Sequence, residues 1–289
     1  MTSDLTKATE RAAIQKLAGT LGLASFEPGW VWLTGAGPGD PGLITALGLY
    51  AISAADVILY DALANDALLA LARPGAELIF AGKRGGKKSC KQSDISRTLV
   101  ALARKGKRVL RLKGGDPLVF GRGAEEALTL AAAGVPFRIV PGVTAGIGGL
   151  AYAGIPITHR DTGHVVTFVT GHGADGKLPD LDWASIAKSS PTLVLYMARQ
   201  FAGVIAARLI AAGRASSEPA AVVANASRDD QAVIVTTLGE LGAAAAASAA
   251  PAILVIGENV RLREHMDWLG AMAGRVLEPA RQPSYGEAS

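Results

Sequence analysis

The chain has 289 residues, 49% of them hydrophobic and 19% charged, which is typical of a globular protein and excludes a disordered one. One cysteine, Cys90, excludes an internal disulfide framework and indicates a reducing cytoplasm. The formal net charge of +4 conceals an uneven distribution of charge along the chain.

Ten short apolar runs rich in β-branched residues predict strands along the whole chain. They cover residues 30–34, 56–60, 77–81, 108–112, 137–140, 165–169, 192–196, 219–223, 232–237 and 252–256. Helical segments are predicted between several of them, at 43–54, 94–105, 123–134, 199–213 and 239–247. Asp40-Pro41 is expected to start the helix at 43–54, because Asp caps a helix and Pro suits its first turn. This alternation predicts α/β layers.

Ten strands are many for one sheet, so we expect two α/β domains with a ligand cleft between them. The first sheet is expected to be mostly parallel and the second mixed, because two strands follow each other directly on either side of residues 225–230. The glycine-rich segment 141–154 is the expected junction. The expected parts are an N-terminal extension at 1–28, α/β domains at 29–141 and 142–270, and a flexible tail at 271–289.

Neither a secretory signal nor a membrane span is predicted. The first 28 residues contain no uninterrupted apolar run. Residues 241–257 carry no charge, but Pro251 divides them into an Ala-rich helix and a short strand. We therefore expect a cytoplasmic protein without a membrane partner.

The basic residues are concentrated between Lys83 and Lys113. This stretch has twelve basic residues and one acid, a net charge of +11, whereas the rest of the chain carries −7. Such a block indicates an anionic partner such as a polycarboxylate, a phosphate or a nucleic acid. A solvated helix face is expected to account for part of it, in particular Arg97, Arg104, Lys105 and Lys107.

Several residues that follow predicted strands are candidates for chemistry. The turn from Gly35 to Asp40 lacks the third glycine of a dinucleotide fingerprint, although Asp56 or Asp61 could supply its acid, so NAD binding is a minor alternative. Asp61 directly follows a strand, where it is either a catalytic carboxylate or a helix cap. Lys83 lies between glycines in Ala-Gly-Lys-Arg-Gly-Gly, which favours a ligand contact over a merely solvated cation.

The most informative segment runs from Arg111 to Gly123 (RLKGGDPLVFGRG). Here a strand ends in a glycine-rich loop with cations, an acid and apolar side chains, a combination that simple packing does not require. Other informative segments are VWLTGAGPGDPGLIT, VILYDAL, AGKRGG, RIVPGVTAGIGGLAYAGIPITHR, YMA and AILVIGENV. With all of these segments in the same order, the chain resembles the uroporphyrinogen-III C-methyltransferases of the tetrapyrrole methylase group over residues 30–270. Leu118 and Ala124 depart from the commoner Phe and Gly.

The resemblance implies a homodimer of two-domain α/β chains with S-adenosylmethionine in the cleft between the domains. The implied reaction adds two methyl groups to carbons of uroporphyrinogen III, through precorrin-1 to precorrin-2, for sirohaem or cobalamin synthesis. Because only about 28 residues precede the first motif, a fused dehydrogenase and chelatase half is not expected.

Carried over residue by residue, the resemblance implies roles for twelve positions. Asp61 would accept a proton and Lys83 would donate one. Arg111 would bind a substrate carboxylate. Arg84 and Arg122 are expected to do the same, because the eight carboxylates of uroporphyrinogen III suit a loop region rich in cations and an arginine fork matches a carboxylate. The methyl donor would be contacted by Pro38, Gly114, Gly115, Asp116, Val119, Thr144, Ala145, Met197 and Ala226.

Other functions are weaker alternatives. The same fold could methylate a later corrin intermediate or RNA, for which the basic block is also suited. A non-catalytic nucleic-acid-binding protein is disfavoured, because no aromatic residue lies between Phe80 and Phe120 to stack on bases. His159, His164 and His172 lack the partners of a metal site, so no metal is expected, although His159-Arg160 could help to hold substrate carboxylates.

Overall fold

The computed structural model describes residues 2–82, 92–173 and 176–279. The chain divides into two compact units, Met1–Gly148 and Gly149–Ser289, and the division falls within the glycine-rich segment 141–154. In the described ranges no helix combines the length and the apolar character needed to cross a membrane.

The first unit is built on a fully parallel five-stranded sheet with the order β3-β2-β4-β1-β5. Its strands are β1 (Val31–Gly35), β2 (Val57–Tyr60), β3 (Glu77–Phe80), β4 (Val109–Lys113) and β5 (Phe137–Val140). Its helices are α1 (Thr2–Thr20), α2 (Ala46–Ala54), α3 (Asp66–Leu69), α4 (Gln92–Arg104) and α5 (Gly123–Ala132), with a 3-10 turn η1 (Pro41–Leu43). Helix α6 (Ala145–Tyr152) spans the division between the units.

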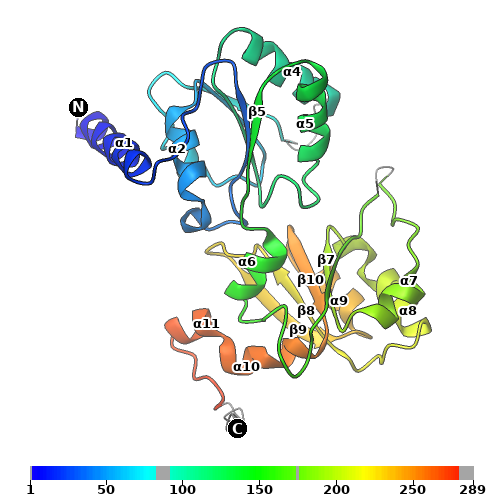
Figure 1. Ribbon diagram of the computed structural model, residues 1–289. Helices are drawn as coiled ribbons and strands as arrows, with labels where there is room; N and C mark the ends of the chain where they lie inside the picture. The colour runs from blue at the N-terminus through cyan, green and yellow to red at the C-terminus, as the bar shows by residue number, and fades with distance from the viewer. Residues whose placement is uncertain (1, 83–91, 174–175, 280–289) are drawn as a thin grey trace, which may run out of the picture. The chain divides into compact units, whose positions relative to one another are not determined.

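Helices cover both faces of this sheet, because alternate residues of each strand point to opposite sides. Trp32, Ile58 and Leu110 pack with residues of α2 and α3. Leu33 and Val109 pack on the other face with residues of α4 and α5. Figure 1 shows α2 on one side of the first sheet and the α4 and α5 pair on the other.

The start of α2 differs from the sequence-based prediction. Asp40 caps the short turn η1, where its side chain accepts a hydrogen bond from Gly42 N at 2.6 Å. Thr45 is the N-cap of α2 and accepts from Gly48 N at 3.0 Å. The prediction that Asp40-Pro41 starts the helix was therefore wrong, because a second capping residue five positions later is the one that satisfies the helix's first free N–H groups.

The second unit holds a mixed sheet with the order β6-β7-β10-β8-β9, in which only β6 and β7 run parallel. Its strands are β6 (Val166–Thr170), β7 (Thr192–Tyr196), β8 (Pro219–Ala224), β9 (Ala232–Thr237) and β10 (Ala252–Ile256). Its helices are α7 (Trp183–Ser189), α8 (Ala202–Ala211), α9 (Leu241–Ala247), α10 (Arg263–Met266) and α11 (Trp268–Met272), with 3-10 turns η2 (Arg199–Phe201) and η3 (Glu258–Leu262).

One apolar core joins α7, α8 and α9 to this second sheet. Trp183, Ile205 and Leu241 supply the helix side of the core, and Leu195 and Leu254 supply the strand side. All ten predicted strands are present with ends within one residue of prediction, and the expected parallel and mixed sheets are confirmed.

Candidate active site

Three loops of the first unit, which follow the neighbouring strands β1, β4 and β5, meet through glycine backbone. Gly115 N donates to Gly37 O at 2.7 Å, and Gly37 N donates back to Gly115 O at 3.3 Å. A Cβ atom on Gly35 would lie 2.5 Å from Gly115 O and 2.6 Å from Gly142 Cα, so no larger residue fits there. Peptide groups rather than side chains therefore line the carboxyl ends of these strands.

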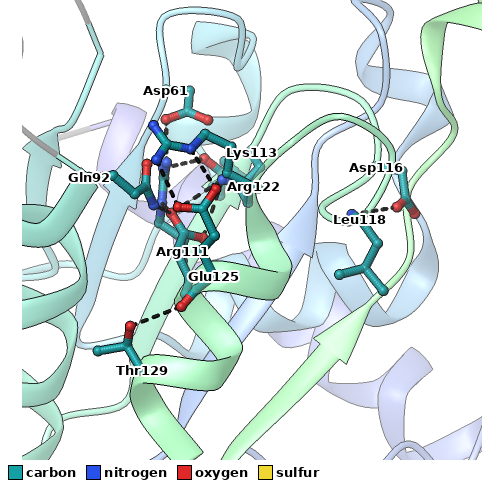
Figure 2. A network of polar contacts seen from close by, with 11 residues as sticks. Asp61, Gln92, Arg111, Lys113, Asp116, Leu118, Arg122, Glu125 and Thr129 are labelled. Carbon is teal, nitrogen blue, oxygen red and sulfur yellow. Dashed lines mark hydrogen bonds and ion pairs between the residues drawn. The ribbon is translucent and has the colours of Figure 1, made fainter. Parts of the chain in front are cut away.

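Asp116 fastens two of these loops together. Its Oδ1 accepts a hydrogen bond from Leu118 N at 2.8 Å, and its Oδ2 accepts one from Gly142 N at 3.0 Å (Figure 2 draws the bond to Leu118). Thr144 and Ala145 lie beside Gly115, with Thr144 Cα 3.9 Å and Ala145 N 4.0 Å from the position of a Cβ there. The Asp116 carboxylate thus holds the loop after β4 against the loop after β5.

The loop after β4 doubles back before α5. Gly123 N donates to Pro117 O at 2.9 Å, and a Cβ on Gly121 would lie 2.7 Å from that oxygen. Phe120 and Arg122 have φ angles of 52° and 60°, a left-handed conformation that costs a non-glycine residue about 1–3 kcal/mol. Such strain is concentrated at functional sites, which supports this loop as part of one.

Behind the loops lies a network of charged side chains, which we call the charge network (Figure 2). Arg111 Nη2 donates to Asp61 Oδ1 at 2.5 Å, and Arg111 Nε donates to Glu126 Oε1 at 3.0 Å. Lys113 Nζ lies 3.3 Å from Glu126 Oε1 and 3.2 Å from its Oε2. Gln92 Nε2 donates to Glu126 Oε1 at 2.9 Å.

The network spans the protein from its surface to its interior. The side chain of Asp61 is 28% exposed, those of Arg111 and Lys113 are 2% and 3% exposed, and that of Glu126 is fully buried. Arg111 and Lys113 are buried because alternation along β4 puts them on the same face as Val109, beneath α4 and α5.

Burial and neighbouring charge act in opposite directions on the two buried cations. Burial lowers the pKa of the Arg111 guanidinium, but the negative charges of Asp61 and Glu126 outweigh it, so the net pKa is raised. Burial, and then the positive charge of Arg111, lowers the pKa of the Lys113 ammonium despite its contact with Glu126. Perturbed groups of this kind often mark functional sites.

Arg122 lies on the exposed side of the same loop. Its Nε and Nη2 atoms lie 2.9 and 2.7 Å from the two carboxylate oxygens of Glu125, and both side chains are more than half exposed. The hydrogen bond from Arg122 lowers the pKa of the Glu125 carboxyl group and raises the pKa of the Arg122 guanidinium.

Two predicted cofactor residues belong to the second unit. Met197 directly follows β7, is 48% exposed and has a φ of 52°. Ala226 follows β8 between Asn225 and Ser227, which have φ angles of 49° and 60°. A Cβ on Gly149 would lie 2.5 Å from the Cβ of Ala226, so α6 packs closely on this turn. Strained residues thus follow strands in both units.

The structure brings together most of the residues singled out from the sequence. In the first unit, Asp61 and Arg111 form one ion pair, and the loops carrying Pro38, Gly114, Gly115, Asp116, Val119, Thr144 and Ala145 meet at the ends of β1, β4 and β5. Lys83 and Arg84 lie outside the described residues.

Two interpretations of single residues change. Asn65, and not Asp61, caps α3, since its side chain accepts from Ala67 N at 2.9 Å. Glu126, Lys113 and Gln92 were missed as site residues. Strand alternation places Lys113 on the same face of β4 as Arg111, and the helical period of α5 places Glu126 on the same face as Leu130. The sequence pattern could therefore have identified Lys113 and Glu126 as buried.

Within the described residues, no group of three or more His, Cys, Asp and Glu side chains could hold a metal ion. His159 Nδ1 lies 3.9 Å from an oxygen of Asp161, and both side chains are exposed.

Comparison with known proteins gives one consistent result. Residues 31–242 match the family model of tetrapyrrole (corrin/porphyrin) methylases. The chain is 61% identical over 259 residues to a uroporphyrinogen-III C-methyltransferase from Sinorhizobium sp., which covers 89% of this chain and 92% of that one. It is 52% identical over 243 residues to siroheme synthase 1 of Yersinia enterocolitica, and there it spans about half the length of the relative, 51%.

Solved structures agree. A uroporphyrin-III C-methyl transferase from Thermus thermophilus complexed with S-adenyl homocysteine has a TM-score of 0.71 and 40% identity, over 80% of this chain and 99% of that one. A cobalt precorrin-4 methyltransferase has a TM-score of 0.72 and 30% identity, over 80% of this chain and 96% of that one.

Proposed function

The chain belongs to the tetrapyrrole (corrin/porphyrin) methylase family, and we propose that it transfers methyl groups from S-adenosylmethionine to two carbons of uroporphyrinogen III. The product of the first transfer is precorrin-1 and that of the second is precorrin-2, a precursor of sirohaem and of cobalamin. The 61% identity to a uroporphyrinogen-III C-methyltransferase over nearly the full length of both chains carries this proposal.

The residues at the strand ends fit the methyl donor. S-adenosylmethionine supplies an electrophilic methyl group on a sulfonium centre. We propose that the peptide group of Gly114, the second lone pair of Gly115 O and the side chain of Thr144 contact the methyl donor, whereas the N–H of Gly115 already donates to Gly37 O. Asp116 holds these loops in place, and each of its oxygens keeps a second lone pair for the ligand. Pro38, Val119, Ala145, Met197 and Ala226 complete the proposed contacts.

Asp61 is the proposed proton acceptor. After methyl transfer to a macrocycle carbon, the cationic product must lose a proton, which a carboxylate base can take. Asp61 Oδ1 is held by Arg111, whereas its Oδ2 makes no hydrogen bond to a described residue. The side chain is the part of the charge network that reaches solvent, so a bound substrate can meet it. Lys83, the proposed proton donor, lies outside the described residues.

Cationic side chains are proposed to bind the substrate carboxylates. The exposed guanidinium of Arg122 is held in a fork by Glu125, so it is already oriented. Arg111 presents a different case, because Glu126, Leu112 O and Asp61 engage its three nitrogens. A contact between Arg111 and a substrate carboxylate would require Nη2 to leave Asp61. Arg84 is proposed because it is a cation in the glycine-flanked segment AGKRGG.

Two further proposals concern the oligomeric state and the location of the protein in the cell. We propose a homodimer, as expected from the resemblance, and a cytoplasmic location, for which the lone Cys90 is the support. Light scattering of the purified protein tests the first, and fractionation of cells that express the full gene tests the second.

Anaerobic incubation with uroporphyrinogen III and S-adenosylmethionine tests the proposed reaction. Mass spectrometry should find tetrapyrroles heavier by one and then by two methyl groups. The alternative, a later corrin intermediate, is supported by the 30% identity to the cobalt precorrin-4 methyltransferase. It requires that uroporphyrinogen III stay unmodified while the corrinoid gains a methyl group.

A further inference from the structure

Glu126 is a fully buried carboxylate on the first turn of α5, and the proposed chemistry does not use it directly. Burying an unpaired carboxylate costs several kcal/mol, so its retention requires partners or a role. Its Oε1 accepts hydrogen bonds from Arg111 Nε at 3.0 Å and from Gln92 Nε2 at 2.9 Å, and Lys113 Nζ lies 3.2 Å from its Oε2. Three elements, α4, β4 and α5, therefore converge on this one group.

These contacts fix the direction of the Arg111 fork. Arg111 Nε donates to Glu126 and Arg111 Nη1 donates to Leu112 O at 3.3 Å. Because the guanidinium is planar, holding these two nitrogens also sets where Nη2 points. Nη2 then meets Asp61 Oδ1 at 2.5 Å.

Lys113 completes the balance of charge. Asp61 and Glu126 share one guanidinium, and without a second cation the two carboxylates would compete for it. The Lys113 ammonium supplies that cation on the inner side, so the four groups sum to zero charge. The Nη2 atom of Arg111 can therefore donate to Asp61 while Lys113 helps to neutralise Glu126.

We propose that Glu126 is a positioning residue that acts through Arg111, orienting the guanidinium that holds Asp61 for proton removal. This inference rests on the proposed function, since it assigns Glu126 a part in the same reaction. It predicts that the charge of Glu126, and not its bulk, matters for turnover.

Glu126→Gln tests it, because the variant keeps the size of the side chain, removes the charge and turns an amide donor toward cationic donors. We expect kcat to fall about 10- to 100-fold. The KM for each substrate and the Kd for S-adenosylhomocysteine, measured by calorimetry, should change less than about threefold. Glu218→Gln is the matched control, since Glu218 is another mostly buried carboxylate, 15% exposed and paired with Arg214 in the second unit. It should lower the melting temperature and leave kcat within about twofold.

A double-mutant cycle tests whether Glu126 affects turnover by positioning Asp61. Single-turnover mass spectrometry measures the slow variants, because conversion of a small fraction suffices. If the two act as one unit, Asp61→Asn with Glu126→Gln should be no slower than Asp61→Asn alone. Additive losses, or a Glu126→Gln enzyme with wild-type kcat, would overturn the proposal.

If Glu126→Gln does not fold, a double variant provides a second test. The Lys113→Met and Glu126→Gln pair removes one charge of each sign, which buried pairs tolerate better than the loss of one partner. The same loss of kcat is expected from it, and wild-type kcat would again overturn the proposal. Failure of the proposed function is distinct, because then the wild-type enzyme itself does not methylate uroporphyrinogen III.

Discussion

Arg111 and Asp61 lie 50 positions apart in sequence and form an ion pair of 2.5 Å between the middle of β4 and the residue that follows the adjacent strand β2. Only the Asp61 end of this pair reaches solvent to any extent, with 28% of its side chain exposed against 2% for Arg111. The carboxylate is therefore presented on a rigid, buried cation, as a base fixed in place for one task would be.

Removing the carboxylate should stop proton removal and spare the binding of the cofactor. We expect Asp61→Asn to lower kcat by about 100-fold or more, within the range of general-base contributions. The Kd for S-adenosylhomocysteine should stay within about twofold of wild type, measured by isothermal titration calorimetry. Near-normal turnover with intact cofactor binding would refute the role of Asp61.

Removing the arginine should lower stability, and it tests whether Arg111 also contacts the substrate. Arg111→Ala leaves Asp61 and Glu126 without the guanidinium they share, and loss of one member of a buried ionic group costs about 3–5 kcal/mol of unfolding free energy. Urea denaturation measures this loss. If Arg111 also binds substrate, the KM for the tetrapyrrole should rise much more than that for S-adenosylmethionine. Equal changes in the two constants would argue against substrate contact.

The glycine loops should not tolerate the replacement of Gly35 by alanine. In Gly35→Ala the new Cβ would lie 2.5 Å from Gly115 O, so the loops must separate. We expect a loss of about 1–3 kcal/mol of stability and weaker binding of S-adenosylhomocysteine. Gly19→Ala is the control, because Gly19 lies on the exposed side of α1 with nothing within 4 Å, and there alanine should raise stability slightly. Unchanged cofactor affinity in Gly35→Ala would contradict the proposed site.

The exposed Arg122–Glu125 pair should show a defined pH dependence. The pKa of Glu125 is lowered in the folded protein, so the pair stabilises the fold above the ordinary pKa of Glu and loses this effect as the pH falls through the lowered value. Both side chains are more than half exposed, which limits the stabilisation to about 0.2–1 kcal/mol at pH 7.

Thermal melts of wild type and Glu125→Gln over a pH series measure this effect. The difference in melting temperature should be present at neutral pH and vanish in acid, and it should be absent at all pH values in an Arg122→Gln background. A difference that grows as the pH falls would show that the pair is not its source.

Strands and sheet classes followed from local pattern. Runs of β-branched residues such as 192–196 and 252–256 are bounded by turn residues, so their limits were predicted correctly. Two consecutive strands around residues 225–230 indicated the antiparallel part of the second sheet. These features depend on neighbours in sequence, which is why they could be predicted.

The charge network depends on tertiary packing, and here prediction from charge alone was incomplete. Arg111 and Lys113 were counted in a basic block facing an anionic partner, yet both are buried and paired with Glu126. The residues assigned to a solvated helix face, Arg104 and Lys105 among them, are indeed exposed. Strand alternation and the helices that cover the sheet determine whether a cation faces water or the core. A net charge counted along the sequence contains neither kind of information.

Isotope labelling tests the central claim most directly. S-adenosylmethionine carrying a ¹³C methyl group is incubated anaerobically with uroporphyrinogen III and the protein, and the extracted tetrapyrrole is examined by ¹³C NMR. The account predicts two labelled methyl groups bonded to ring carbons, appearing one after the other, and none in the Asp61→Asn variant on the same timescale. Label on oxygen or nitrogen, or an unlabelled tetrapyrrole in the presence of bound cofactor, would contradict it.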